Sequence, residues 1–366
     1  MKLFNNVFSG KKVLVTGNTG FKGSWLTLWL LKMEAEVYGF SNGIPTSPSN
    51  FEASGIKDKI TYFDIDITIL ENVINIIDIV RPDFIFHLAA QAIVQDSFRD
   101  PQNTILTNVM GTCNILEALR RLSFKCIAIM VTSDKCYDNK EWVWGYKETD
   151  LLGGKDPYSA SKGAAELICK TYSDSFFRGL DSKVKIATAR AGNVIGGGDW
   201  AKYRIIPDAV RAWSKGHELV IRSPKSTRPW QHVLEPLSGY LLLGQKLFEN
   251  ENLCGESFNF GPKHENNYTV EQLLIEMAGY WSDVKWRIEN NQSMKNEAGL
   301  LKLNCDKAMH LLNWLPNLSF QETIQLVSEW YKSFYEKPQE SMFDTTMNQI
   351  DFYIHIANKQ KLLWTI

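Results

Sequence analysis

The sequence contains no apolar run that approaches the roughly 18 residues a membrane-spanning helix needs. Its first residues, Met1 to Asn6, lack the long apolar core of a secretion signal. Lysine and arginine number 40 and aspartate and glutamate 41, so neither sign of charge is in excess. A balanced chain has no broad electrostatic field for nucleic acid or an anionic lipid surface. We therefore expect no membrane span, no signal peptide and no nucleic-acid partner.

Cysteine pairs of the CxxC type are also absent. The six cysteines lie within apolar runs or beside expected strand ends, as buried free thiols do, at positions 113, 126, 136, 169, 254 and 305. This pattern predicts no metal site, and a reducing cytoplasm is the simplest location. No repeat or low-complexity tract interrupts the 366 residues, which suffice for two lobes.

What the first half does contain is an alternation of short apolar runs and amphipathic segments. The apolar runs predict buried parallel strands at Lys12–Thr16, Glu36–Phe40, Thr61–Ile65, Phe84–Leu88, Cys126–Thr132 and Val184–Ala189. The amphipathic segments predict helices at Lys22–Met33, Ile69–Val80, Thr104–Leu122 and Pro157–Phe177. This order favours an α/β fold, a doubly wound parallel sheet of the Rossmann type.

The second half has a looser pattern. Short strands are expected at Leu219–Ile221 and Ser257–Phe260, and helices at Ile205–Lys215, Pro236–Phe248, Val270–Tyr280 and Phe320–Glu336. We predict a nucleotide-binding domain over residues 1–190, whose sheet regains a segment from 230–260. A smaller mixed α/β substrate domain over 191–337 then covers the carboxyl edge of the sheet, where open α/β folds bind ligands. Residues 338–366 form a tail that is either docked or part of an interface.

Three glycines spaced three apart follow the first strand. Gly17 permits a tight turn, Gly20 lets the backbone approach a pyrophosphate, and Gly23 lets the next helix pack closely. The intervening Thr19, Phe21 and Lys22 complete the turn, and the helix N-terminus offers free N–H groups to phosphates. The spacing predicts a dinucleotide site, although glycines in a turn also have simpler uses.

A second motif begins the helix expected from Pro157. Asp156 suits an N-cap, and Tyr158 and Lys162 then stand one turn apart on one face. A nearby ammonium and a positive nicotinamide ring would lower the pKa of the phenol, so that it could take a proton from a hydroxyl during hydride transfer. Taken alone, the motif fits an ordinary helix start equally well.

Together, the glycine triplet and the Tyr158–Lys162 pair resemble the extended short-chain dehydrogenase/reductase family. The resemblance implies bound NAD or NADP and a sugar-nucleotide substrate. It places Tyr158 and Lys162 beside the cofactor and assigns further contacts to Asp64 and Ile65 near the adenine, to Leu88, Ala89 and Gln91 near the ribose and pyrophosphate, and to Asn108, which steadies that loop and the active-site helix. His87 is either a ligand contact or a packed side chain.

The residues after the fifth strand narrow the reaction. Ser133 occupies the position from which family members hydrogen-bond the reacting hydroxyl, and Asp134 and Lys135 follow it. Two ionisable groups indicate proton transfers beyond a hydride shuttle. The trio resembles the sugar-nucleotide 4,6-dehydratases, and its Asp-Lys order resembles the CDP-glucose branch. A solvated strand end would also explain the two charges.

The resemblance implies a role for each of these side chains. The sugar is oxidised at carbon 4, loses the carbon 5 proton and the carbon 6 hydroxyl, and regains hydride at carbon 6. A protonated Asp134 would deliver a proton to the leaving hydroxyl. A neutral Lys135, buried beside Lys162, would take the carbon 5 proton.

Four longer stretches also match the CDP-glucose branch, at residues 142–146, 152–158, 190–200 and 228–233. Within them, Arg190 and Arg228 offer planar forks suited to a pyrophosphate or to sugar oxygens. Asn193 and the glycines after it suit close backbone approach to the same group. Each arginine could instead form a structural ion pair.

The choice between NAD and NADP is open at the second strand, where Phe40 to Gly43 include neither an acidic residue nor an arginine clamp. The resemblance implies NAD. It also implies a homodimer that pairs the helices near 104–122 and 157–177 into a four-helix bundle. Alternatives are a dehydratase for dTDP- or GDP-sugars, a sugar-nucleotide 4-epimerase, and a non-catalytic NAD-binding scaffold.

Overall fold

A computed structural model describes residues 2–179, 181–221, 223–263, 266–282, 284–289 and 300–365. At its centre is a seven-stranded sheet in the order β11-β6-β5-β4-β1-β2-β3, in which every pair of neighbours is parallel. The strands are β1 (Lys12–Thr16), β2 (Glu36–Ser41), β3 (Thr61–Asp64), β4 (Phe84–His87), β5 (Cys126–Val131), β6 (Val184–Arg190) and β11 (Ser257–Asn259). The predicted α/β fold class is confirmed.

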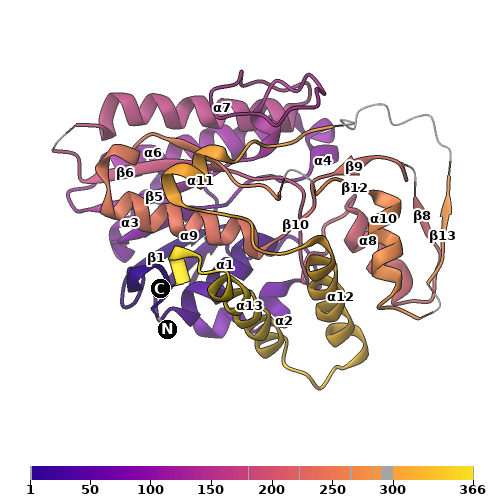
Figure 1. The fold of residues 1–366 in the computed structure, drawn as a ribbon. Coiled ribbons are helices and arrows are strands. Elements are labelled where there is room, and N and C mark those ends of the chain that lie inside the picture. The colour runs from indigo at the N-terminus through magenta and orange to yellow at the C-terminus, as the bar shows by residue number, and fades with distance from the viewer. Residues whose placement is uncertain are drawn as a thin grey trace.

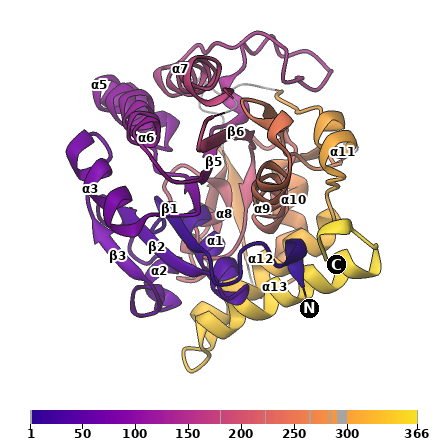
Figure 2. The same cartoon turned by 90° about the vertical axis from the view of Figure 1, so that its left-hand side faces the viewer.

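Helices cover both faces of this sheet (Figures 1 and 2). On one face α3 (Leu70–Val80), α6 (Gly111–Arg120) and α7 (Pro157–Tyr172) pack in a row. On the other lie α1 (Phe21–Lys32), α9 (Leu234–Glu249) and α13 (Met342–Lys359). Because both faces are covered, every residue of β4 and β5 is buried, and all of them except His87 at the end of β4 are apolar.

Two of the expected long helices are interrupted by a wider, π-helical turn. The segment expected at 104–122 begins earlier, as α5 (Pro101–Ile105), because the Asp100 side chain caps the Asn103 N–H at 3.0 Å. A π-turn at Leu106–Met110 then joins α5 to α6, and a second one at Ser173–Phe177 follows α7. Such turns are insertions into the helical ladder that hydrophobic periodicity does not reveal.

The second half contributes to both lobes. β11 pairs with β6 and so extends the main sheet, which places this segment with the first half of the chain. The smaller lobe, on the right in Figure 1, contains β8 (Leu219–Ile221) paired with β13 (Trp286–Ile288), and the helices α8 (Ile205–Trp213) and α10 (Val270–Ala278). Short pairs complete it: β7 (Val194–Ile195) with β10 (Gln231–His232), and β9 (Thr227–Arg228) with β12 (Tyr268–Thr269).

The last residues dock on the first lobe. After α11 (Asp306–Leu312) and α12 (Phe320–Glu336), α13 packs against α1. Near the C-terminus the Trp364 ring stacks on Phe4, and the two termini lie close together in Figure 1. Aromatic packing therefore fixes this segment. None of the described helices combines the length and apolar character that a membrane crossing requires.

Candidate active site

The glycine turn between β1 and α1 is closely packed. Gly17 has a φ of +72°, and a Cβ on it would lie 2.7 Å from the Ala89 nitrogen. A Cβ on Gly23 would lie 2.1 Å from the Gly17 carbonyl oxygen. Both contacts are with backbone, which cannot move aside as a side chain can. Glycine is therefore required at both positions, at the turn and at the helix–strand contact.

The N-terminus of α1 is open to a ligand. Its N-cap is Gly20, which provides no side-chain cap, and the first turn of the helix carries no acidic residue. The first N–H groups of a helix carry partial positive charge and bind phosphate when no side chain satisfies them. Phe21 and Lys22 begin the helix, and Gly20 and Gly23 on either side of them have no side chain that could block a ligand. This turn therefore fits a dinucleotide pyrophosphate.

Side chains at the ends of β2 and β3 join this turn to the outer part of the sheet. The Thr19 hydroxyl donates to the Gly43 carbonyl at 2.8 Å, and the Thr19 N–H donates to Ser41 Oγ at 3.3 Å. The Asp64 carboxylate accepts the Gly43 N–H at 2.9 Å, and Ile65 follows it at the carboxyl end of β3. Asp64 thus lies at the edge expected for the adenine, while it orders the β2 loop.

The loop after β4 is held from both sides. Thr16 Oγ1 accepts the N–H groups of Leu88 and Ala89, at 3.2 and 3.1 Å. Asn108 exchanges hydrogen bonds with the Gln91 backbone at 2.8 and 3.0 Å. Its amide also donates to Ser161 Oγ on α7 at 2.9 Å. Asn108 therefore fixes the loop relative to the helix that carries Tyr158.

His87 is a packed side chain. Its two ring nitrogens pair with hydroxyl groups, Nδ1 with Thr16 Oγ1 at 2.8 Å and Nε2 with Thr112 Oγ1 at 3.2 Å. Burial lowers its pKa to about 3. Of the two interpretations left open by the sequence, the geometry fits internal packing.

The trio after β5 forms a compact group. Ser133 Oγ donates to Asp134 Oδ1 at 3.0 Å, and Lys135 Nζ lies 3.7 Å from the same oxygen. The Asp134 side chain is 3% exposed, whereas the Lys135 side chain is 36% exposed. The Asp134 carboxylate also packs closely against Gly192, since a Cβ on that glycine would lie 1.8 Å from Asp134 Oδ2. The expected burial of Lys135 is not observed.

Tyr158 and Lys162 both lie buried on the first turns of α7, which Asp156 caps through the Ser159 N–H at 2.9 Å. The turn at Asp134–Cys136, which carries the trio, packs against α7, so the helix and the trio meet. Burial raises the pKa of Tyr158, and the charge of Lys135 and the neighbouring Ser133 hydroxyl oppose this. In the protein alone burial outweighs both, and the expected lowering, which includes the charge of a bound nicotinamide ring, stays a prediction.

Several buried amines surround this group. Burial lowers the pKa of Lys162 to about 8, while the Glu166 charge raises it. Burial, followed by the charge of Arg204, lowers the pKa of half-buried Lys22 to about 7, and Asp134 opposes the shift. Lys22 Nζ also lies 3.5 Å from the Tyr240 hydroxyl. The side chains of Lys22 and Arg204 were not assigned to catalysis from the sequence. For Lys22 the sequence did contain a signal, because a lysine at the start of an otherwise apolar helix is unusual.

Arg190 forms its contacts inside the protein. Its guanidinium is buried, with Nη2 2.7 Å from Glu166 and Nη1 2.7 Å from the Tyr137 hydroxyl. Glu166 also accepts the hydroxyls of Thr132 and Thr188. The expected pyrophosphate contact of Arg190 does not fit this placement, because a buried carboxylate already occupies its planar fork. The alternative, a structural ion pair, is what the structure contains.

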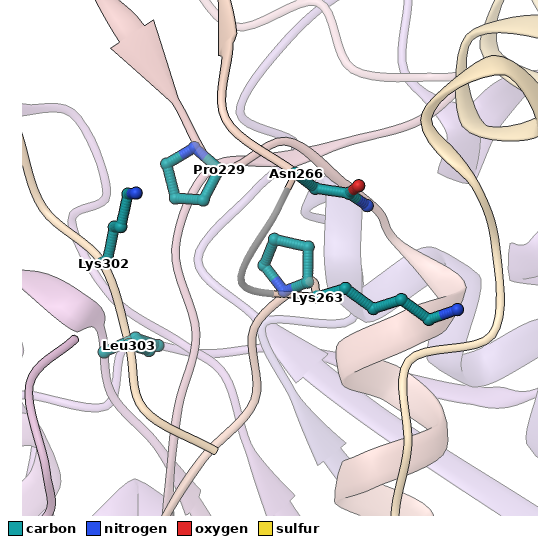
Figure 3. A pocket seen from close by; sticks show the side chains of 6 residues that line it. Pro229, Lys263, Asn266, Lys302 and Leu303 are labelled. Atoms are coloured by element: carbon teal, nitrogen blue, oxygen red, sulfur yellow. The ribbon is translucent and has the colours of Figure 1, made fainter. Parts of the chain in front are cut away.

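Asn193 and Arg228 both follow β6 in the chain, in its second half. Asn193 adopts a φ of +52°, and its carbonyl accepts the Gln231 N–H at 3.3 Å. Arg228 lies on β9, part-buried, with Nη1 2.8 Å from the Thr227 carbonyl. Next to Arg228 is a cavity of about 10 Å³, shown in Figure 3 and lined by Pro229, Pro262, Lys263, Asn266, Lys302 and Leu303. That volume is close to the minimum for one water molecule.

No cluster of three or more potential metal ligands occurs among the described residues. Residues 14–327 match the family described as GDP-mannose 4,6 dehydratase. The CDP-glucose 4,6-dehydratase of Salmonella typhimurium is 43% identical over 357 residues, which cover 97% of this chain and 99% of that protein.

Two solved structures share the fold. The Thermus thermophilus UDP-glucose 4-epimerase in complex with NAD has a TM-score of 0.74 at 24% identity, covering 88% of this chain and 99% of that one. The Bacillus anthracis dTDP-glucose 4,6-dehydratase in complex with NAD has a TM-score of 0.71 at 22% identity, covering 90% and 100%. The matched family spans most of the sequence, and the chain therefore belongs to the GDP-mannose 4,6 dehydratase family.

Proposed function

We propose that this protein is a CDP-glucose 4,6-dehydratase that makes CDP-4-keto-6-deoxyglucose. The observation that carries the proposal is the convergence of Ser133, Asp134 and Lys135 with Tyr158, because a dehydration needs an acid and a base beside the group that handles the carbon 4 hydroxyl. The 43% identity to the Salmonella typhimurium enzyme supports the nucleotide and the sugar.

The cofactor is NAD, which when bound supplies the hydride acceptor and donor of the reaction. Gly17, Gly20 and Gly23 would hold its pyrophosphate against the N-terminus of α1, and Asp64 would reach its adenine end. The loop from Leu88 to Gln91, steadied by Asn108, would line the path between them.

In the oxidation step Tyr158 accepts the proton of the carbon 4 hydroxyl, and Ser133 orients that hydroxyl. Lys162, one turn along α7, would add a positive charge on the same face of the helix, and the Glu166 charge on the next turn stabilises its ammonium. Because burial raises the pKa of Tyr158, a phenolate can form only if nearby positive charges, those of the protein and of the bound cofactor, lower that pKa.

In the elimination step Asp134 donates a proton to the carbon 6 hydroxyl, which leaves as water, and Lys135 accepts the proton of carbon 5. Lys135 then returns its proton to carbon 5 when hydride reaches carbon 6. Arg228 and Asn193 are the proposed contacts of the nucleotide diphosphate. Residues 1–190, 191–337 and 338–366 serve as the cofactor lobe, the substrate lobe and the docked tail.

We propose further that the protein is a cytoplasmic homodimer. Apolar side chains are exposed on the outer faces of the α5–α6 segment and of α7 with its π-turn: Ile105, Leu106, Met110, Leu167 and Phe176. Two such pairs of helices would bury these side chains in a four-helix bundle. All six cysteines are free thiols, in agreement with a reducing compartment.

The test is to incubate the purified protein with CDP-glucose and, separately, with dTDP-glucose. The proposal predicts the loss of one water by mass and an alkali-induced 4-keto absorbance, with CDP-glucose the faster substrate. A change of configuration without loss of water would indicate an epimerase instead. Dehydration of dTDP-glucose alone would reject the proposed nucleotide.

A further inference from the structure

The end of β2 decides which adenine dinucleotide a fold of this kind accepts. In NAD sites an acidic residue at this place holds the ribose hydroxyls, whereas a nearby arginine accommodates the 2′-phosphate of NADP. This chain has neither, because β2 ends at Ser41 and is followed by Asn42 and Gly43. The carboxylate that would discriminate between the two dinucleotides is therefore missing from the strand on which it is expected.

The buried side chain of Ser41 does not replace that carboxylate. Its hydroxyl is used inside the glycine turn, where it donates to Asn18 Oδ1 at 2.9 Å and accepts the Thr19 N–H at 3.3 Å. The Thr19 hydroxyl donates to the Gly43 carbonyl at 2.8 Å, so the loop after β2 is tied to the turn that fits the pyrophosphate. Asn42 is exposed and is the polar side chain at this strand end that remains open to a ligand.

A carboxylate that follows the neighbouring strand is bound to Asn42. β3 is the parallel neighbour of β2 at the edge of the sheet, so the two strands end on the same side (Figure 2). Asp66, two residues after β3, accepts the Asn42 amide at 3.0 Å through Oδ2 and the Thr68 N–H at 2.8 Å through Oδ1. Asp64 accepts the Gly43 N–H at 2.9 Å. The loop after β2 is thus attached to two carboxylates.

No cationic side chain belongs to these segments. The sequence has no lysine or arginine at residues 41–56, which follow β2, or at residues 61–80, which contain β3 and the two carboxylates. A 2′-phosphate at this place would meet negative charge without an arginine or lysine from either segment to pair with it. Ribose hydroxyls, in contrast, can donate to a carboxylate or to the free amide oxygen of Asn42.

We propose that Asp66, held by Asn42, selects NAD over NADP in this protein. The Asp66 carboxylate takes the place of the acid that β2 lacks: it accepts a ribose hydroxyl of NAD and repels the 2′-phosphate of NADP. This inference rests on the proposed cofactor site at the glycine turn. It names the side chain that sets the choice of dinucleotide, which the residues of β2 alone leave open.

The test is the affinity of the purified protein for NAD and, in a separate titration, for NADP, measured by calorimetry after bound nucleotide has been removed. Asp66→Asn keeps the shape of the side chain and an oxygen for the Thr68 N–H, and removes the charge. We expect the ratio of the NADP to the NAD dissociation constant to fall by about tenfold, as for one charge a few ångströms from a doubly charged phosphate in water. Asp78→Asn, at an exposed acid near the other end of α3, is the matched control and should leave the ratio unchanged.

Two further measurements separate charge from shape. Asn42→Arg changes an exposed side chain and should also lower the ratio, because a guanidinium there neutralises Asp66 and can pair with a 2′-phosphate. Added salt should lower the ratio in the unaltered protein more than in Asp66→Asn, since salt screens exposed charges.

A ratio in Asp66→Asn equal to that of the unaltered protein would overturn the assignment of Asp66. If Asp66→Asn bound neither dinucleotide, the ratio in Asn42→Arg would decide in the same way. Failure of the unaltered protein to bind NAD is a different result, since it rejects the proposed cofactor site itself. Binding needs no sugar substrate, so none of these results depends on the dehydration assay.

Discussion

At the scale of single residues, the site is defined by amines that the fold removes from water. Burial lowers the pKa of Lys22 to about 7 and that of Lys162 to about 8. The two lysines lie on different helices, α1 and α7, and the charge of Lys162 contributes to the lowered pKa of Lys22.

This arrangement predicts how stability depends on pH. An amine whose pKa is lower in the folded than in the unfolded protein binds fewer protons when folded, so the free energy of unfolding rises with pH between about 7 and 10.5. Lys22→Met should flatten this rise. A shift of one pKa unit corresponds to about 1.4 kcal/mol in the free energy of unfolding. Because water partly screens the half-buried ammonium, we expect Lys22 to contribute on the order of 2 kcal/mol to the rise.

Urea unfolding of the purified protein at several pH values between 6.5 and 9 measures the effect. Lys57→Met, at an exposed lysine, is the matched control and should leave the slope unchanged. An equal slope in Lys22→Met and the unaltered protein would show that Lys22 keeps its ordinary proton affinity.

Residue identity predicted some of these contacts and not others. Tyr158, Lys162 and Ser133 could be placed because a spacing of four on a helix and a position at a strand end each define a direction in space. Arg190 could not be assigned, because a guanidinium suits a carboxylate as well as a pyrophosphate. Only the fold reveals that the guanidinium of Arg190 meets the carboxylate of Glu166, which lies one turn beyond Lys162 on α7.

At the scale of elements, helix α1 depends on the absence of a side chain at its first turn. Gly23→Ala should force the helix away from β1, because the added Cβ would meet backbone atoms of Gly17 and Asn18 at 2.1 and 2.8 Å. We expect a loss of about 1–3 kcal/mol in stability and weaker NAD binding. Chemical denaturation and calorimetry with NAD measure the two effects.

Gly179→Ala is the control, since nothing lies within 4 Å of a Cβ at that glycine. It should change stability by no more than about 0.5 kcal/mol. Unchanged NAD affinity in Gly23→Ala would contradict the assignment of this turn to the pyrophosphate.

Helix α13 is held by a buried polar contact as well as by aromatic rings. The Tyr353 hydroxyl donates to Glu235 at 2.8 Å and lies 3.0 Å from Ser238 Oγ, both on α9. Tyr353→Phe removes a donor from a buried carboxyl group and should cost about 1–3 kcal/mol in thermal or chemical unfolding. Phe352→Leu, on the exposed side of the same helix, should cost less than about 0.5 kcal/mol. Equal losses in the two variants would contradict this anchoring.

The elements of the first half followed from sequence because parallel strands buried on both faces are continuously apolar, and most strand ends fell within one residue of those observed. α12 was predicted at its observed bounds, Phe320–Glu336. Its first residue is fixed by a capping box between Ser319 and Glu322. The π-turns after α5 and α7 and the helical tail were not foreseen. These elements depend on tertiary contacts, such as the packing of α13 against α1, which local periodicity in the sequence does not reveal.

At the scale of the whole molecule, the exposed apolar faces of α5 to α7 predict association. Leu167 is 58% exposed, and a charge there would have to be buried in a four-helix bundle. Leu167→Glu should therefore convert a dimer to monomers in sedimentation velocity. Ile79→Glu alters another exposed apolar residue, 67% exposed on α3, and should leave the dimer intact. A monomeric unaltered protein would reject the proposed bundle.

The whole fold brings Asp134, Lys135 and α7 with Tyr158 together, and we propose that these three side chains act on one sugar in sequence. The most direct test uses CDP-glucose deuterated at carbon 4, followed by NMR and mass analysis of the product. The account predicts a 4-keto-6-deoxy product with the deuterium on carbon 6. Deuterium retained on carbon 4 of an unchanged or epimerised sugar would contradict it.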